Sequence, residues 1–158
     1  MNKPQFVYTT YIQTTAEKLW EALTKGEFTQ QYWNGFRVES DWHVGSPMKF
    51  YAPDGSLAHS DKVLRADKPK VLSYSWKPIM KGMPDEPASM VIFELEPEGN
   101  LVKLTVTHCD FPDNSEILPM ISNGWPLVLS SLKSFLETGI ALTYSFKSDC
   151  SKQYSEKA

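Results

Sequence analysis

Cysteine and histidine are scarce in this sequence, with 2 cysteines and 3 histidines among 158 residues. A small secreted domain held together by disulfides would carry more than Cys109 and Cys150, and neither cysteine belongs to a C-x-x-C motif. The histidines, His43, His59 and His108, lie far apart, and no H-E-x-x-H pattern occurs. Because recognisable redox and metal motifs are missing, we expect no metal and no cofactor.

Long apolar runs and basic runs are missing as well. No window approaches the roughly 18 apolar residues of a membrane-spanning helix, and the N-terminal segment MNKPQFVYTTYIQTT lacks the apolar core of a signal peptide. The net charge is −3 and the pI about 5.6, without any run of lysine or arginine. We therefore expect a cytoplasmic protein that binds no nucleic acid and does not insert into membranes.

Patterns that support catalysis are equally hard to find. There is no glycine-rich loop for phosphate binding, and acidic residues such as Asp54 lie at turns, where they are solvated. His108 and Cys109 are neighbours, but neighbouring residues of a strand point to opposite faces and cannot form a nucleophilic pair. The residue pattern therefore assigns no catalytic group.

The composition that remains is typical of a globular protein rich in aromatic residues. Hydrophobic residues make up 41% of the chain, charged residues 22% and aromatic residues 13%, and 158 residues suit one domain better than two. We expect a single domain over residues 1–146, followed by a polar tail at 147–158. Five tryptophans require large apolar surroundings: Trp20, Trp33, Trp42, Trp76 and Trp125.

Alternating apolar and polar segments predict a succession of short strands joined by turns. The predicted strands cover residues 5–12, 36–42, 47–52, 57–66, 71–77, 88–96 and 101–110. One or two short helices should follow the first strand. The first begins after an N-cap at Thr14 or Thr15 and ends near Gly26, and residues 27–33 are the candidate for the second. Strands joined by short turns should pair antiparallel.

The segment 116–138 predicts one long helix, irregular near Pro119 and Pro126. Its apolar residues recur at helical spacing and form one stripe: Trp125, Val128, Leu129, Leu132, Phe135 and Leu136. The other face is polar and includes Ser131, and Gly139 is the expected C-cap. Because only this helix is long enough to cover the sheet, the pattern predicts an α+β fold of the helix-grip kind. A curved antiparallel sheet of about six or seven strands wraps around the helix and leaves a cleft where the two surfaces diverge.

Several strings, in this order and spacing, resemble a known family. They are QTTAEKLWEALT at 13–24, YWNGFRVESDWHVGSPMKF at 32–50, VLSYSW at 71–76, LTVTHCDF at 104–111 and GWPLVLSSLKSFLETG at 124–139. The chain resembles the START-like (Bet v 1-like, SRPBCC) superfamily, and more closely the bacterial group related to the C-terminal domain of the activator of heat-shock-protein-90 ATPase. The resemblance covers residues 5–140.

The resemblance implies a helix-grip fold and often a hydrophobic pocket between helix and sheet, but not one reaction. Relatives include lipid carriers, hormone receptors, and polyketide aromatases and cyclases. We therefore expect a sensor or carrier of a small hydrophobic molecule, such as a lipid, polyketide or flavonoid-like aromatic. A polyketide cyclase-like enzyme with His108 as acid/base beside a tyrosine is the first alternative. A co-chaperone-like interaction module or homodimer without a ligand is the second.

The candidate pocket residues are mostly apolar and come from the long helix, the strands and the segment before the second strand. They are Trp33, Phe36, Trp42, Met48, Phe50, Tyr74, Trp76, Phe93, Val106, His108, Trp125, Leu129 and Leu132. Met80, Met83 and Met90 would provide an adaptable lip. His108 shares a face with Val106, so it is either a polar contact for a ligand or a histidine satisfied by backbone or water. A filled core is the other interpretation of the same pattern.

Overall fold

The computed structural model describes residues 3–144, so Cys150 and the tail expected at 147–158 lie outside the described residues. Ten elements follow one another along the chain. They are β1 (Phe6–Ile12), α1 (Ala16–Thr24), α2 (Gly26–Tyr32), β2 (Arg37–Glu39), β3 (Pro47–Tyr51), β4 (Leu57–Asp67), β5 (Val71–Trp76), β6 (Ser89–Glu98), β7 (Leu101–Cys109) and α3 (Ile117–Thr138).

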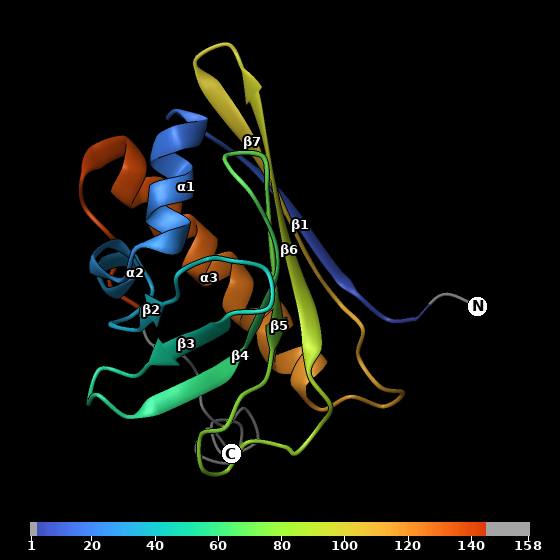
Figure 1. Cartoon of the computed structure of the whole chain (residues 1–158). Coiled ribbons are helices and arrows are strands. Elements are labelled where there is room, and N and C mark those ends of the chain that lie inside the picture. The colour runs from blue at the N-terminus through green and yellow to red at the C-terminus, as the bar shows by residue number, and fades with distance from the viewer. Residues whose placement is uncertain (1–2, 145–158) are drawn as a thin grey trace, which may run out of the picture.

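The seven strands form one antiparallel sheet in the order β1-β7-β6-β5-β4-β3-β2. The two short helices carry the chain from β1, at one edge, to β2 at the opposite edge. Figure 1 shows the sheet curving around the three helices, which lie together on its concave side. The sequence prediction of an α+β helix-grip fold is therefore confirmed.

Strand β7 shows how the sheet separates core from surface. Val102, Leu104, Val106 and His108 are buried, while the residues between them are partly exposed. Phe93 on β6 is buried and pairs with the buried Val106, so the alternate residues that face the core lie opposite one another on the two strands. This alternation is what the period of two in the sequence predicts for a sheet covered on one face.

Helix α3 runs without a break through Pro126, although the sequence suggested an irregularity there. Pro119 lies in the first turn, where the missing N–H has no partner to lose. Gly139 ends the helix in a left-handed conformation at φ 81°, with its N–H bonded to the Phe135 carbonyl. Ser131 corrects the expected polar face: it is fully buried, and its hydroxyl accepts the N–H of Leu142 at 3.1 Å.

The N-cap of α1 is Thr15, one of the two residues expected, and its hydroxyl accepts the N–H of Lys18 at 3.2 Å. One strand is shorter than the sequence predicts. The strand expected at 36–42 is reduced to Arg37–Glu39, because the Ser40 hydroxyl accepts the N–H of Trp42 and turns the chain. Trp42 takes a positive φ of 61°, and its indole N–H reaches back to the Thr24 carbonyl at 2.9 Å.

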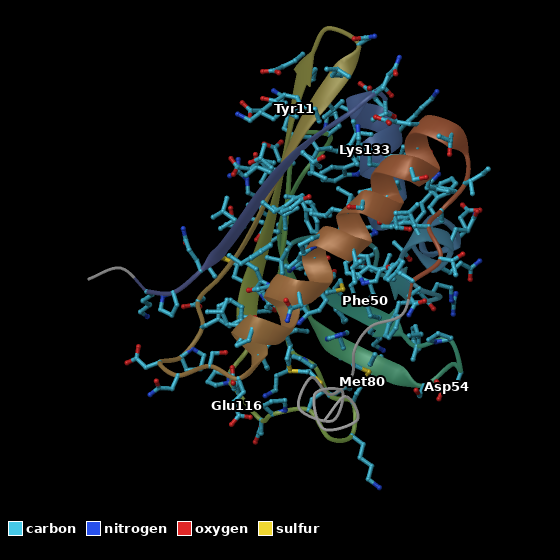
Figure 2. All side chains as sticks on the ribbon, turned by 180° about the vertical axis from the view of Figure 1, so that it is seen from behind. Tyr11, Phe50, Asp54, Met80, Glu116 and Lys133 are labelled. Atoms are coloured by element: carbon cyan, nitrogen blue, oxygen red, sulfur yellow. The ribbon has the colours of Figure 1, made fainter. Side chains whose placement is uncertain are left out.

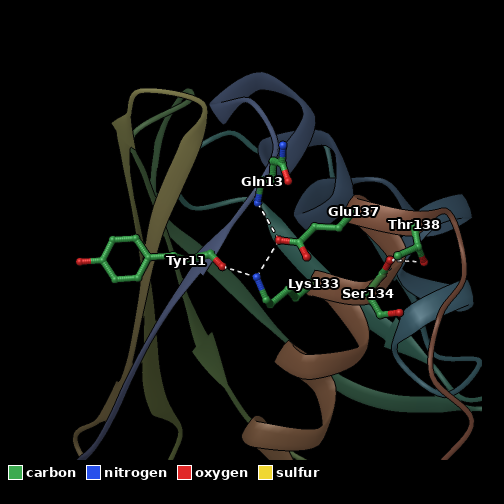
Figure 3. A network of polar contacts seen from close by, with 6 residues as sticks. All are labelled: Tyr11, Gln13, Lys133, Ser134, Glu137 and Thr138. Atoms are coloured by element: carbon green, nitrogen blue, oxygen red, sulfur yellow. Dashed lines mark hydrogen bonds and ion pairs between the residues drawn. The ribbon is translucent and has the colours of Figure 1, made fainter.

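The C-terminal half of α3 is tied to strand β1 by a polar network (Figure 3). The Lys133 ammonium donates to the Tyr11 carbonyl at 2.6 Å and pairs with Glu137 at 2.6 Å. The Glu137 carboxylate also accepts the backbone N–H of Gln13 at 2.8 Å. This half of the helix is therefore held against β1, at the edge of the sheet.

Among residues 3–144, no helix is both long and apolar enough to cross a membrane. The same residues contain no cluster of three or more side chains of the types that ligate metals.

Candidate functional site

A cleft of about 600 Å³ opens beside the N-terminal half of α3. Its floor comes from β3, β4 and β5, one side from the end of α2, and its outer side from the loop after β5. The lining residues are Trp33, Asn34, Phe36, Phe50, His59, Trp76, Met80, Lys81, Gly82, Met83, Met120, Ile121, Gly124, Trp125 and Val128. In Figure 2, Phe50 and Met80 lie in the part of the molecule away from Lys133 and Tyr11.

Three indole rings from three different elements form the inner wall of the cleft. Trp33 follows α2, Trp76 ends β5 and Trp125 lies on α3. The Trp33 and Trp76 rings are nearly parallel, at 16° with centroids 6.3 Å apart, and Trp125 meets Trp33 edge-on at 5.4 Å. Phe50 closes the group 4.8 Å from Trp33. All four side chains are buried against one another, so each ring holds its neighbours in place.

The outer side of the cleft is the loop 77–88, which carries Met80 and Met83. Methionine side chains are unbranched and adapt to irregular shapes, which suits a wall that closes around a ligand. Met90, the third methionine expected at the lip, lies on β6 and does not line the cleft. The base of the loop is fastened by Lys77, whose ammonium donates to the Asp85 carboxylate at 3.0 Å and to the Glu86 carbonyl.

Glu86 joins this loop to the start of α3. Its carboxylate accepts the Ser115 hydroxyl at 2.6 Å and the backbone N–H groups of Glu116 and Ile117 at 2.6 and 3.3 Å. The first N–H groups of a helix lack partners within the helix and attract negative charge. Glu86 therefore caps α3 from a distant segment and holds two walls of the cleft together.

Replacing Glu86 with alanine should lower the free energy of unfolding by about 1–2 kcal/mol, because the helix loses an anionic cap. Urea unfolding followed by circular dichroism measures this change. Asp85→Ala is the matched control, since the Asp85 side chain is 99% exposed and its ion pair should contribute little. Equal stabilities of the two variants would contradict the capping role of Glu86.

His59 is the one side chain with a buried, unpaired nitrogen or oxygen atom in the described part of the chain. Its side chain comes from β4 opposite Phe50 and lines the cleft. Its ring lies 4.2 Å from Trp76 between centroids, and its Nδ1 atom has no hydrogen-bond partner among residues 3–144. Burial lowers the pKa of His59 from 6.5 to about 3, so the ring is neutral at neutral pH.

His108 is buried too, but its hydrogen bonds are complete. The Trp125 indole N–H donates to Nδ1 at 3.0 Å, and Nε2 lies 2.7 Å from the Ser89 hydroxyl. Because Nδ1 accepts, a neutral His108 ring must carry its proton on Nε2 and donate to Ser89. Burial and the neighbouring His59 lower the pKa of His108 to about 3. His108 therefore positions Trp125 from behind and does not line the cleft.

Of the predicted pocket residues, the structure brings five to the cleft: Trp33, Phe36, Phe50, Trp76 and Trp125. The other eight do not line it. They are Trp42, Met48, Tyr74, Phe93, Val106, His108, Leu129 and Leu132. Seven of these are buried in the core, and Trp42 packs on its margin. Two of the buried residues, Phe93 and His108, contact Trp125 on the side away from the cleft.

Sequence reasoning missed His59, Ile121, Gly124 and Val128 as lining residues. The strand containing His59 reads Leu57-Ala58-His59-Ser60-Asp61, and its alternation does not reveal which face is inward. Pairing with β3 decides this, since His59 lies opposite the buried Phe50. Ile121 and Gly124 precede Trp125 by four residues and by one, so extending the helical stripe by one turn would have found Ile121.

Comparisons with known proteins agree with this architecture. A solution structure of a Cytophaga hutchinsonii protein is 27% identical with a TM-score of 0.69, over 86% of this chain and 96% of that one. A crystal structure of a Mesorhizobium loti protein is 25% identical with a TM-score of 0.72, over 84% and 96%. The Aha1 dimer from Colwellia psychrerythraea is 23% identical with a TM-score of 0.70, over 86% and 98%.

No curated protein matches the chain significantly. The family model described as "Activator of Hsp90 ATPase homolog 1-like protein" matches residues 13–137. This match begins before α1 and ends at the last turn of α3, so it includes most of the sheet and every element that borders the cleft. The chain therefore belongs to the Activator of Hsp90 ATPase homolog 1-like protein family.

Proposed function

We propose that this protein binds a small, mainly apolar molecule in the cleft, as a sensor or carrier. The observation that carries the proposal is an aromatic-walled cleft of about 600 Å³, which is within the range of roughly 300–1,000 Å³ that accommodates small ligands. Indole rings are large, rigid and apolar, so a cleft that they line suits an apolar, flat molecule.

The close packing of the rest of the core supports a binding role for the cleft. Between the sheet and the C-terminal half of α3, large side chains such as Leu104, Leu129 and Leu132 are fully buried. The core is therefore filled beside the C-terminal half of α3, whereas the aromatic-walled cleft lies beside its N-terminal half. A loosely packed core would distribute small voids throughout the interior instead.

The lining favours binding over catalysis. Among the described residues, His59 and Lys81 are the only ionisable side chains that line the cleft, and no carboxylate or thiol accompanies them. General acid–base catalysis needs groups that converge on one reacting atom. His108, the acid/base of the cyclase hypothesis, has both ring nitrogens engaged.

The test is a titration with 1-anilinonaphthalene-8-sulfonate, following its fluorescence together with the thermal midpoint of unfolding. A ligand that binds only the folded state must raise the midpoint. Ile121→Trp should fill the cleft and weaken binding roughly tenfold, which corresponds to about 1.4 kcal/mol. Leu127→Trp is the matched control, because Leu127 lies on the same helix, is exposed and does not line the cleft.

Equal affinities of the two variants would place the dye elsewhere and count against the proposal. A saturable fluorescence increase without any rise in the midpoint would also count against it, because it would indicate binding to partly unfolded protein.

A further inference from the structure

One polar side chain of the mainly apolar cleft, His59, is buried without a hydrogen-bond partner for its Nδ1 atom among the described residues. His59 has only 7% of its surface exposed, and Nδ1 is buried without a hydrogen bond to any described residue. No hydrogen bond involving Nε2 is found among residues 3–144 either. Leaving a buried polar atom unpaired is costly, and native structures contain few such atoms.

The neighbours of the ring cannot supply the missing partner. Trp76 packs 4.2 Å from the His59 ring at 41°, and Phe50 meets the ring nearly at right angles, at 82° and 5.9 Å. The other imidazole nearby, that of His108, is bonded on both sides to Trp125 and Ser89. A partner for His59 must therefore enter through the cleft that the ring lines.

The chemistry of the ring restricts what that partner can be. A neutral imidazole carries one donor and one acceptor, and its burial disfavours a charge at this depth. A hydroxyl both donates and accepts through one atom, so it can pair with the ring nitrogen that faces it in either tautomer. Rotation about the Cβ–Cγ bond has two comparable positions for histidine, so the ring can turn a nitrogen towards the cleft.

The rest of the ligand must match the aromatic walls. Trp33, Trp76 and Trp125 stand around the same space as His59, and their rings favour stacked or edge-on aromatic partners. We infer that the ligand is a flat aromatic molecule with a hydroxyl group that forms a hydrogen bond with the imidazole of His59. This inference rests on the proposed function and makes His59 the residue that determines specificity.

The experiment compares 2-naphthol with naphthalene, which differ by one hydroxyl, by calorimetric titration of the wild-type protein and of His59→Phe. Phenylalanine keeps a flat ring and removes both nitrogens. The preference for 2-naphthol should be roughly tenfold larger in the wild-type protein than in His59→Phe, because the variant leaves the buried hydroxyl unpaired. His43→Phe is the control, since the His43 side chain is 83% exposed and the preference should stay at the wild-type value.

A second measurement does not depend on a folded variant. Nitrogen-15 chemical shifts of the His59 ring in the wild-type protein should change on addition of 2-naphthol more than on addition of naphthalene, because only the first makes a hydrogen bond. 2-Methoxynaphthalene can accept a hydrogen bond from His59 but cannot donate one. If it changes the nitrogen-15 shifts of the ring as 2-naphthol does, the ring is the donor of the hydrogen bond.

The outcomes separate the inference about His59 from the proposed function of the cleft. If both compounds bind and the preference is the same in wild-type protein and His59→Phe, water satisfies the ring and the inference about His59 is overturned while the proposed function stands. If neither compound binds, or if Ile121→Trp leaves their binding unchanged, the cleft is not the ligand site and both fail.

Discussion

Replacing Trp125 with alanine is expected to destabilise the folded protein by about 3–5 kcal/mol, the range for removing a large buried aromatic side chain. Trp125 is 3% exposed and contacts Trp33, Trp76 and Phe93 at centroid distances of 5.4 to 5.9 Å. The substitution also removes the N–H that bonds His108, which leaves a buried acceptor unpaired. Urea unfolding with circular dichroism measures the effect.

Trp125→Phe separates the two contributions. It retains much of the ring volume but removes the indole N–H, and we expect a smaller loss of about 1–3 kcal/mol. Leu127→Ala is the surface control, because Leu127 is two positions further along α3 and 39% exposed. If Trp125→Ala were no more destabilising than Leu127→Ala, the indole would not be a structural centre of the cleft.

Lowering the pH from 7 to 5 is expected to reduce the free energy of unfolding by about 2 kcal/mol for each of His59 and His108. Burial lowers the pKa of each from 6.5 to about 3 in the folded protein. Between these values the unfolded chain binds a proton that the folded chain excludes, so stability falls as the pH falls. The loss begins near pH 6.5 and continues to about pH 3.

Unfolding curves at half-unit steps between pH 7.5 and 4.5 test this dependence. His59→Phe should show a clearly shallower slope than the wild-type protein, because one of the two buried imidazoles is gone. His43→Gln removes an exposed imidazole and should leave the slope unchanged. A wild-type slope in His59→Phe would mean that His59 takes up its proton without unfolding, and that the ring is more hydrated than its burial indicates.

The fold was predictable because its signals are local and repeated. The alternation in β7 and the apolar stripe of α3 each recur over several turns or residue pairs, so one misread residue does not change the result. The errors lie at boundaries. The strand ending at Glu39 was expected to continue to Trp42, but the Ser40 hydroxyl turns the chain there, and a single side-chain hydrogen bond leaves no periodic pattern.

The site was predictable only in part. Trp33, Phe50, Trp76 and Trp125 line the cleft and could be selected because large aromatic side chains on inward faces are few. His108 was selected for the same inward face, yet its two hydrogen bonds place it behind the wall. Whether an inward residue lines a cavity or fills the core depends on the local distance between helix and sheet, which no periodicity encodes.

The sequence by itself determined the kind of fold, the order of its elements and the family, because these depend on hydrophobic period, turn residues and the spacing of motifs. The tertiary structure alone decided where the interior is open. Glu86 caps α3 and Lys133 ties its far end to β1, and both contacts join segments distant in sequence. They hold the two ends of α3 in place, and the cleft that His59 lines lies beside the N-terminal half of that helix.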